Sequence, residues 1–373
     1  MERFDYLIVG CGIAGITMAE RVASVGKTCL IVDKRSHIGG NCYDHQDEHG
    51  VLIHPYGPHY FRTNSEEVVT YLSQFTAWQP TEYRVLSYID GSYYNFPINL
   101  NTFEQIIGRP SDEAEMLATL ESWRAPIAEP KNSEEVIVSQ VGRKLYEMFF
   151  MNYTLKQWKL HPRDLEASVC GRIPIRTNRD DRYLSEKFQA LPKNGYTEMF
   201  RKMLKSPLIE IRLETDYRDV AESVQWERMI YTGMIDAFFD FQFGPLPYRS
   251  LRFEHEHHEM HFYQPAMQVN FPNEQDYTRI IEIKHATGQH IDGTTIIKEY
   301  PEDFGPGKEP YYPVPTQASR QLYDRYKELA DALPNVTFLG RLAMYRYYNM
   351  DQIVANALLQ FSKLQSGQRG TLG

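Results

Sequence analysis

Three glycines, Gly10, Gly12 and Gly15, lie between an apolar run at residues 6–9 and a segment with apolar residues at helical spacing. In a strand–turn–helix unit, the first glycine permits the tight turn, the second lets the backbone approach a pyrophosphate, and the third lets helix and strand pack closely. The next apolar run, residues 28–32, ends at Asp33. A carboxylate there accepts hydrogen bonds from ribose hydroxyls and repels a 2′-phosphate. The sequence therefore predicts a Rossmann-like parallel sheet that binds a dinucleotide other than NADP.

A second glycine-bearing turn, at residues 37–41, follows Asp33 and Lys34. Such a turn is typical of flavoproteins of the glutathione reductase type, so we expect FAD rather than NAD. The helix N-terminus after Gly12 then faces the phosphates. The cofactor contacts expected from this part of the chain are Gly10, Gly12, Gly15, Asp33, Lys34, Gly39, Gly40 and Asn41.

Changes of pattern along the chain predict an α/β protein in three parts. Residues 66–157 are mostly helical, with a hairpin at 85–96 that turns at Asp90-Gly91 and a long amphipathic helix at 133–150. Residues 169–182 lack periodicity and are rich in arginine, as in an exposed lid. We expect an FAD-binding domain at 1–80, about 210–245 and 315–373. We expect a helical insert at about 81–180, with a mobile lid near 166–182. The third part is an antiparallel substrate domain at about 183–209 and 246–314.

The charge and cysteine content exclude several classes of protein. A formal net charge of -9 argues against a nucleic-acid surface. The 4 cysteines have no metal-binding spacing, which favours reduced thiols in the cytoplasm. We find no uninterrupted apolar run of about 18 residues, so we expect no membrane contact. The run His255, His257, His258 and His261 alternates between strand faces without a completing acid or cysteine, and we expect no metal there.

Ten ordered motifs resemble those of the UDP-galactopyranose mutase family over nearly the whole chain. They are Gly39-Gly-Asn41, Tyr56-Gly-Pro-His-Tyr-Phe61, Tyr153-Thr-Leu-Lys-Gln-Trp158, Arg172-Ile-Pro-Ile-Arg176, Gly195-Tyr-Thr197, Tyr231-Thr-Gly233, Tyr248-Arg-Ser250, Tyr277-Thr-Arg279, Pro310-Tyr-Tyr-Pro313 and Gly340-Arg-Leu342. The resemblance implies an FAD-dependent isomerase that interconverts the pyranose and furanose forms of a nucleotide-diphosphate hexose. It implies that N5 of reduced flavin attacks the anomeric carbon, and that the products serve polysaccharide biosynthesis.

The resemblance also implies the site residues. His59, Arg172 and Arg279 are the expected catalytic residues, and His59, Arg341, Met350 and Asp351 are further cofactor contacts. The expected substrate contacts are Arg62, Tyr83, Phe149, Tyr153, Thr154, Trp158, Arg172, Tyr183, Arg249, Asn270, Arg279, Tyr312, Tyr347 and Asn349.

Three residues near the sugar depart from the family pattern. Arg62 replaces the second histidine of the usual HxFHT motif, Tyr83 stands where asparagine is common, and Asn349 replaces an aspartate. UDP-galactose, UDP-N-acetylgalactosamine and a dTDP-6-deoxyhexose such as dTDP-fucose therefore stay open as substrates. An FAD amine-oxidase-like oxidoreductase and a nucleotide-sugar-binding protein without turnover are the alternative functions, and monomer or homodimer is left open.

Overall fold

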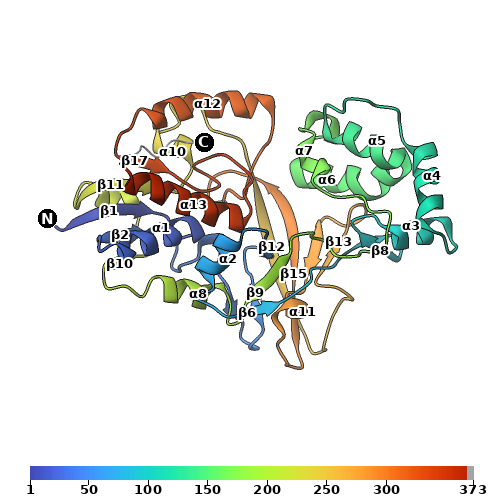
Figure 1. Ribbon diagram of the computed structural model, residues 1–373, viewed down its shortest axis with the longest axis horizontal. Coiled ribbons are helices and arrows are strands. Elements are labelled where there is room, and N and C mark those ends of the chain that lie inside the picture. The colour runs from blue at the N-terminus through green and yellow to red at the C-terminus, as the bar shows by residue number, and fades with distance from the viewer. Residues whose placement is uncertain (368–373) are drawn as a thin grey trace.

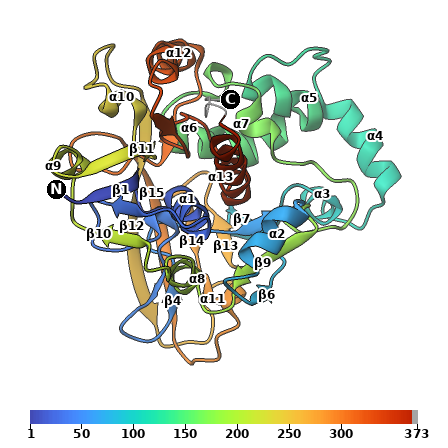
Figure 2. The same ribbon diagram turned by 60° about the vertical axis from the view of Figure 1, so that its left-hand side comes forward.

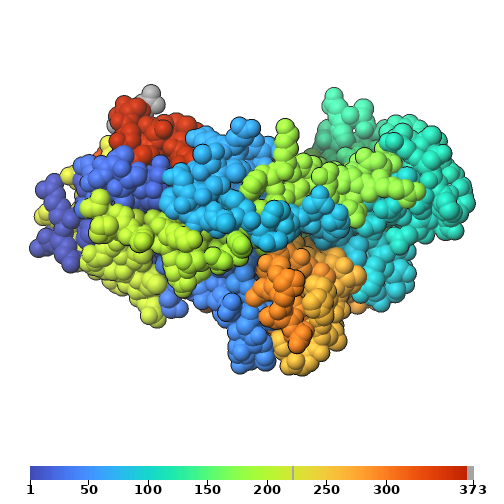
Figure 3. Space-filling view, turned by 60° about the horizontal axis from the view of Figure 1, so that its bottom comes forward, coloured from blue at the N-terminus to red at the C-terminus, as the bar shows by residue number. Residues whose placement is uncertain are grey.

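The computed structural model describes residues 1–367 and shows three parts side by side along the long axis (Figure 1). A five-stranded sheet with its helices lies at one end, a helical insert at the other, and a seven-stranded sheet between them. A space-filling view gives the same order, with the insert in teal at one end (Figure 3). Residues 368–373 of the predicted segment 315–373 lie outside the described residues.

The five-stranded sheet is parallel and has the order β10-β2-β1-β11-β17. Its strands are β1 (Arg3–Val9), β2 (Cys29–Val32), β10 (Ile209–Arg212), β11 (Gln225–Tyr231) and β17 (Val336–Phe338). The covering helices are α1 (Ile13–Ser24), α8 (Tyr196–Met203) and α13 (Met350–Gln365) on one face, and α10 (Ile235–Phe238) and α12 (Gln317–Asp331) on the other (Figure 2). Because both faces are covered, Leu7 and Ile8 are fully buried. The predicted Rossmann-like sheet is confirmed.

The seven-stranded sheet has the order β16-β12-β15-β14-β13-β7-β8, and only β13 and β7 pair in parallel. Its strands are β7 (Val85–Ile89), β8 (Ser92–Phe96), β12 (Tyr248–His258), β13 (Gln268–Asn270), β14 (Arg279–Ile281), β15 (Thr294–Asp303) and β16 (Tyr312–Pro313). The hairpin predicted at 85–96 forms, but it belongs to this sheet rather than to the insert alone. It joins this sheet because β7 forms hydrogen bonds with β13. The sequence of the hairpin alone does not reveal that pairing, since β13 lies far along the chain.

The predicted segment 183–209 contributes no strand to the seven-stranded sheet, which corrects its assignment to the substrate domain. Its strand β9 (Phe188–Pro192) pairs instead with β5 (Phe61–Thr63) and β6 (Trp78–Pro80). Its helix α8 packs on α1, because Met199 and Phe200 are buried in the core beside the parallel sheet. The smaller elements of the fold are β3 (His45–Gln46), β4 (Leu52–Ile53), α2 (Glu66–Leu72), α9 (Tyr217–Ala221) and α11 (Lys284–Thr287).

The insert contains α3 (Leu100–Ile107), α4 (Glu113–Trp123), α5 (Ser133–Tyr146), a π-helical turn (Glu147–Met151), α6 (Asn152–Trp158) and α7 (Ser168–Gly171). The helix predicted at 133–150 is interrupted at Gly142, whose φ is 78°. A Cβ at that position would lie 2.3 Å from Trp123 O, so close packing of α4 requires the glycine. The π-helical turn then sets the direction in which Phe149 and Tyr153 face. Among residues 1–367, no helix is long and apolar enough to span a bilayer.

The second half of the predicted lid, residues 176–182, is bound to the start of α3. The contacts are hydrogen bonds of Arg176 N to Ile98 O (3.0 Å) and of Leu100 N to Asn178 O (2.9 Å), and an ion pair of Arg179 with Glu104 (2.7 Å). Most arginines that led to the prediction of an exposed lid therefore have structural partners. Arg172, in the first half of the predicted lid, lines the cavity described below.

Candidate active site

The backbone of the glycine turn after β1 is not covered by side chains of its own, so another group can approach it closely. Gly10 has a φ of 102°, and a Cβ on Gly15 would lie 2.0 Å from Gly10 O. The second glycine turn lies directly opposite, because a Cβ on Gly40 would lie 2.9 Å from Gly12 Cα. Two backbones and the N-terminus of α1 thus form a cradle that fits the pyrophosphate of a dinucleotide.

Asp33 and Lys34 follow β2 but have different surroundings. The Asp33 carboxylate accepts hydrogen bonds from Cys11 N (2.6 Å) and Arg35 N (2.9 Å), so it lies beside the glycine turn. Lys34 pairs with Asp216, and 71% of its side chain is exposed. The Lys34 side chain therefore turns toward Asp216, and its assignment as a cofactor contact stays a prediction. Arg35, which donates to Asn41 Oδ1 (2.8 Å), is the cation beside the cradle that the sequence did not single out.

A cavity of about 420 Å³ lies between Asn41, at the end of the second glycine turn, the seven-stranded sheet and the insert. Four arginines line it, and no Asp or Glu among the described residues does so. The predicted residues that line it are Asn41, His59, Arg62, Phe149, Tyr153, Thr154, Trp158, Arg172, Tyr183, Asn270, Arg279, Tyr312, Arg341, Tyr347, Asn349 and Met350. In a chain with a net charge of -9, this local excess of positive charge indicates an anionic ligand.

His59 lies at the wall of this cavity and is uncharged. Its Nδ1 lies 2.8 Å from Gly57 O, and its backbone N donates to His54 Nδ1 at 3.2 Å. Burial, together with the nearby His54 and arginine charges, lowers the pKa of His59 to about 3. A carbonyl can only accept, so Nδ1 carries the proton and Nε2 is left as an acceptor.

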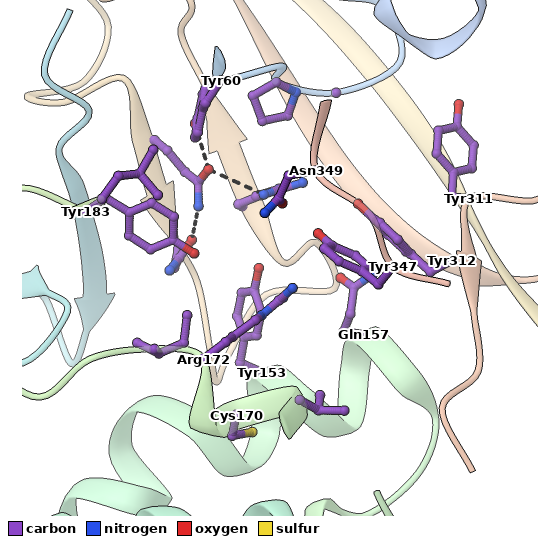
Figure 4. A pocket seen from close by; sticks show the side chains of 18 of the residues that line it. Tyr60, Tyr153, Gln157, Cys170, Arg172, Tyr183, Tyr311, Tyr312, Tyr347 and Asn349 are labelled. Carbon is purple, nitrogen blue, oxygen red and sulfur yellow. Dashed lines mark hydrogen bonds between the residues drawn. The ribbon is translucent and has the colours of Figure 1, made fainter. Parts of the chain in front are cut away.

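Arg172 points toward Tyr347 at one wall of the cavity (Figure 4), and Arg341, which follows β17, approaches the same ring. The Arg172 guanidinium carbon lies 4.7 Å from the Tyr347 ring centroid, and that of Arg341 lies 5.0 Å from it. Tyr347 stacks on Tyr312, with the ring centroids 5.5 Å apart. Although desolvation opposes ionisation, the charges of Arg172 and Arg341 hold the pKa of Tyr347 below its ordinary value. The cluster thus concentrates positive charge and phenol hydroxyls at one wall.

Arg279, at the start of β14, also lines the cavity and is held by the strand next to its own. Glu299 lies directly across from it on β15, and Arg279 Nη2 lies 2.6 Å from Glu299 Oε2. Arg279 Nη1 donates to Gln268 Oε1 at 3.3 Å, and the buried Nε has no partner among the described residues. Two fixed contacts on one side leave the guanidinium able to bind an anion with its free N–H groups.

Tyr83 and Arg249 do not line the cavity, contrary to their assignment as substrate contacts. Tyr83 is fully buried behind Tyr60, and its hydroxyl donates to Ala190 O at 3.0 Å. Arg249 is also buried and donates through Nε to Gln157 O at 3.0 Å, so it supports α6. Asp351 lies in the first turn of α13, outside the cavity.

Several cavity residues were missed by the sequence analysis. They include Tyr60, Gln157, Gln268 and Gln352, and Glu299 acts from behind Arg279. Glu299 stands between Lys298 and Tyr300 in the polar second half of β15, so nothing in the local sequence marks it as buried. Tyr60 and Gln157 stand inside two of the motifs quoted above, which was the signal for them, whereas Gln268 and Gln352 carry no such signal.

The histidine run lies on β12 and the loop that follows it. His49, His257 and Glu259 bring their ligand atoms within 4.8 Å of one another in the described part of the chain. The rings of His49 and His257 are stacked, however, at 3.6 Å with an interplanar angle of 13°. An imidazole lone pair lies in its ring plane, so two parallel rings do not converge on one ion. The absence of a metal stays a prediction that this geometry favours.

The fold and the cavity define an α/β protein with a dinucleotide cradle opening onto a cationic, aromatic site. A family model for UDP-galactopyranose mutase matches residues 148–347, and one for an NAD(P)-binding Rossmann-like domain matches residues 8–75. The probable UDP-galactopyranose mutase of Klebsiella pneumoniae is 38% identical over 363 residues, covering 96% of this chain and 94% of that protein. The dTDP-fucopyranose mutase of Escherichia coli is 36% identical, covering 94% of this chain and 96% of that protein.

Solved structures share the fold. A reduced UDP-galactopyranose mutase superimposes with a TM-score of 0.79 at 16% identity, covering 97% of this chain and 96% of the other. Putrescine oxidase superimposes with a TM-score of 0.62 at 13% identity, covering 98% of this chain and 99% of the other. The chain belongs to the UDP-galactopyranose mutase family. The predictions of this family, of an isomerase and of FAD as cofactor are confirmed.

Proposed function

We propose that this chain interconverts UDP-galactopyranose and UDP-galactofuranose with reduced FAD in the cradle. The observation that carries the proposal is the cavity itself, which combines four arginines with several tyrosines and has no carboxylate in its described lining. A nucleoside diphosphate supplies the matching charge, and aromatic rings suit a base and a sugar.

We also propose that the enzyme works in the cytoplasm and supplies furanose precursors for polysaccharides. Sedimentation of the holoenzyme distinguishes monomer from homodimer.

The cradle residues fit FAD. The backbones of Gly12 and Gly40 leave room for the pyrophosphate, and Asp33 lies beside them for the ribose. The buried Arg341 Nε has no partner among the described residues and would hold an acceptor atom of the cofactor or the substrate. When bound in its reduced form, FAD supplies the N5 electron pair that attacks the anomeric carbon. Neutral His59 offers an acceptor at the cavity wall for a hydroxyl or N–H proton.

Arg172 and Arg279 have the positions needed to stabilise the leaving diphosphate. They come from the lid and from β14, so a diphosphate between them receives donors from two sides. Charge on the diphosphate grows as its bond to the sugar breaks, and fixed guanidinium groups stabilise that growing charge most. Tyr312 and Tyr347 add hydroxyl donors on the same wall.

The insert supplies the site for the base. Phe149, Tyr153, Thr154 and Trp158 line the end of the cavity formed by the π-helical turn and α6. Stacking of a base on an aromatic face contributes about 1–3 kcal/mol and tolerates changes of base. These residues therefore fit uridine and thymidine alike, and base stacking does not separate UDP from dTDP sugars.

A second candidate substrate is a UDP-2-acetamido sugar, which Arg62 favours. Arg62 lines the cavity, and its Nε is held by Glu186 at 2.9 Å, so the remaining guanidinium N–H groups can donate to a carbonyl. Tyr83 lies behind the cavity wall, so it does not fill space beside a sugar that lacks a hydroxyl, such as a 6-deoxy sugar. The dTDP-fucopyranose relative keeps dTDP-fucose among the substrates to test.

Turnover of three substrates by dithionite-reduced enzyme tests the proposal. The substrates are UDP-galactopyranose, UDP-N-acetylgalactosamine and dTDP-fucopyranose, with products separated by anion-exchange chromatography. We expect conversion of UDP-galactopyranose, and Arg62→His separates the candidates because it removes the guanidinium donors. Preferential loss of the acetamido substrate in that variant would establish the second candidate. Conversion of dTDP-fucopyranose alone would overturn the proposed substrate but not the reaction class.

A further inference from the structure

Gln268 on β13 connects two residues that we place at the substrate. It is almost completely buried and lines the cavity. Its Oε1 accepts hydrogen bonds from Tyr60 Oη at 2.8 Å and from Arg279 Nη1 at 3.3 Å. Its Nε2 donates to Asn270 Oδ1 at 2.7 Å. One amide therefore contacts three cavity residues that come from two strands and the segment before β5.

The donor chemistry of these residues fixes every amide orientation in the network. A guanidinium nitrogen can only donate, so the Gln268 atom that faces Arg279 must be the carbonyl oxygen. The Gln268 NH₂ group then faces Asn270, and Asn270 must turn its own carbonyl oxygen toward Gln268. The reversed arrangement places donor against donor at Arg279 and acceptor against acceptor at Asn270.

The consequence is that Asn270 presents a donor to the cavity. Its Oδ1 is used by Gln268, and its Nδ2 has no hydrogen-bond partner among residues 1–367. A nucleotide sugar is rich in acceptor oxygens, on phosphate, on the base and on the sugar hydroxyls. An Asn270 that turned its carbonyl into the cavity would instead repel the phosphate oxygens and the carbonyl oxygens of the base, which can only accept.

We propose that Gln268 is a positioning residue that holds Asn270 as a hydrogen-bond donor and Arg279 at a fixed angle toward acceptor oxygens of the bound nucleotide sugar. The proposal rests on the proposed function, because it takes Asn270 and Arg279 as substrate contacts. Gln268 acts through these two residues. Glu299 still holds Arg279 when Gln268 is changed, so the main effect falls on binding through Asn270.

A double-mutant cycle tests this role with UDP-galactopyranose and dithionite-reduced holoenzyme. The variants are Gln268→Met, Asn270→Ala and the double variant. Gln264→Met is the matched control, since Gln264 is buried near the same sheet but donates only to backbone carbonyls, those of Ala266, Met267 and Ile280. KM and kcat are measured separately, together with FAD content and Tm.

We expect Gln268→Met and Asn270→Ala each to raise KM about tenfold, the effect of roughly one hydrogen bond, with kcat changed less than about threefold. The double variant should have a KM no more than about threefold above the higher single value, because both changes remove the same contact. Gln264→Met should leave KM within about twofold while lowering Tm. A KM for Gln268→Met equal to that of Gln264→Met, or multiplicative effects of about a hundredfold, overturns the proposal.

Failure of the proposed function gives a different result. If wild-type enzyme does not convert UDP-galactopyranose, the proposed substrate fails, and the same cycle is measured as the dissociation constant of UDP for the oxidised holoenzyme. Non-additive weakening there supports the role of Gln268, and additive or absent weakening overturns it. No binding of UDP to the wild-type enzyme would overturn both proposals.

Discussion

Replacement of Glu299 by methionine tests the buried ion pair that holds Arg279. The two residues face each other on adjacent antiparallel strands, with side-chain exposures of 1% for Glu299 and 17% for Arg279. Methionine is close to glutamate in volume, so the change removes the charge and the acceptor with little change in packing. Arg279 keeps its charge, because burial and loss of Glu299 do not deprotonate a guanidinium.

The expected loss follows from the burial of the pair. Removing one partner of a buried ion pair costs about 3–5 kcal/mol, since the other charge is left without compensation. We take about 3 kcal/mol because Arg279 retains contact with the cavity. An unfolding entropy of about 2.1 cal/mol/K per residue gives roughly 0.8 kcal/mol/K for this chain, so Tm should fall by about 4 °C.

Thermal unfolding of four holoenzymes, followed by circular dichroism, measures this effect. Besides wild type they are Glu299→Met, Arg279→Met and the double variant, which has no uncompensated charge and should recover more than half of the lost stability. Glu254→Gln is the control, because Glu254 pairs with Arg252 at side-chain exposures of 43% and 45%. That surface pair should change Tm by less than about 1 °C. Additive losses in the double variant would refute the coupling.

Arg172→Ala should lower kcat/KM roughly 30- to 150-fold, equivalent to the loss of about 2–3 kcal/mol of charged hydrogen bonding, whereas Arg179→Ala, whose partner is Glu104, should change steady-state kinetics less than about twofold. Tyr83→Phe should cost about 1 kcal/mol in urea unfolding and leave KM unchanged, and a raised KM would show that the hydroxyl reaches substrate. A phenolate absorbing at 295 nm should form below the ordinary pKa of tyrosine in apoenzyme, and this titration should be lost in Tyr347→Phe, because Arg172 and Arg341 lower the pKa of Tyr347. Since the folded pKa lies below the unfolded one, this tyrosine adds stability only as pH rises above its folded pKa; a stability curve identical to that of Tyr347→Phe would contradict the assignment.

Local patterns predicted the parallel sheet well, because strand, glycine turn and helix are adjacent in the chain. The pairing of strands that lie far apart in the chain could not be predicted in this way. The hairpin at β7 and β8 was found from its own alternation and turn, but its place beside β13 depends on a strand far along the chain. Likewise, Gly142 interrupts a helix that its neighbours' periodicity predicts to be continuous, and the cause is packing against Trp123.

The candidate site shows the same division. Arg172, Arg279 and Tyr347 were expected from motifs, and the structure brings all three to one cavity. Residues that hold other cavity residues in place, such as Glu299 and Gln268, have no motif, and their roles depend on strand register and on which side-chain atoms face each other. Tyr83 was expected at the substrate because it departs from the family pattern. Such a departure does not reveal whether the side chain points into the cavity.

Anaerobic incubation of the holoenzyme with UDP-galactopyranose, with and without dithionite, tests the central claim most directly. Chromatography of the nucleotide sugars measures the furanose product, and Arg279→Ala holoenzyme with full FAD content serves as the control. The account predicts UDP-galactofuranose only from the reduced wild-type enzyme, with severe loss in Arg279→Ala. Equal conversion by oxidised enzyme, or wild-type rates in Arg279→Ala, would contradict it.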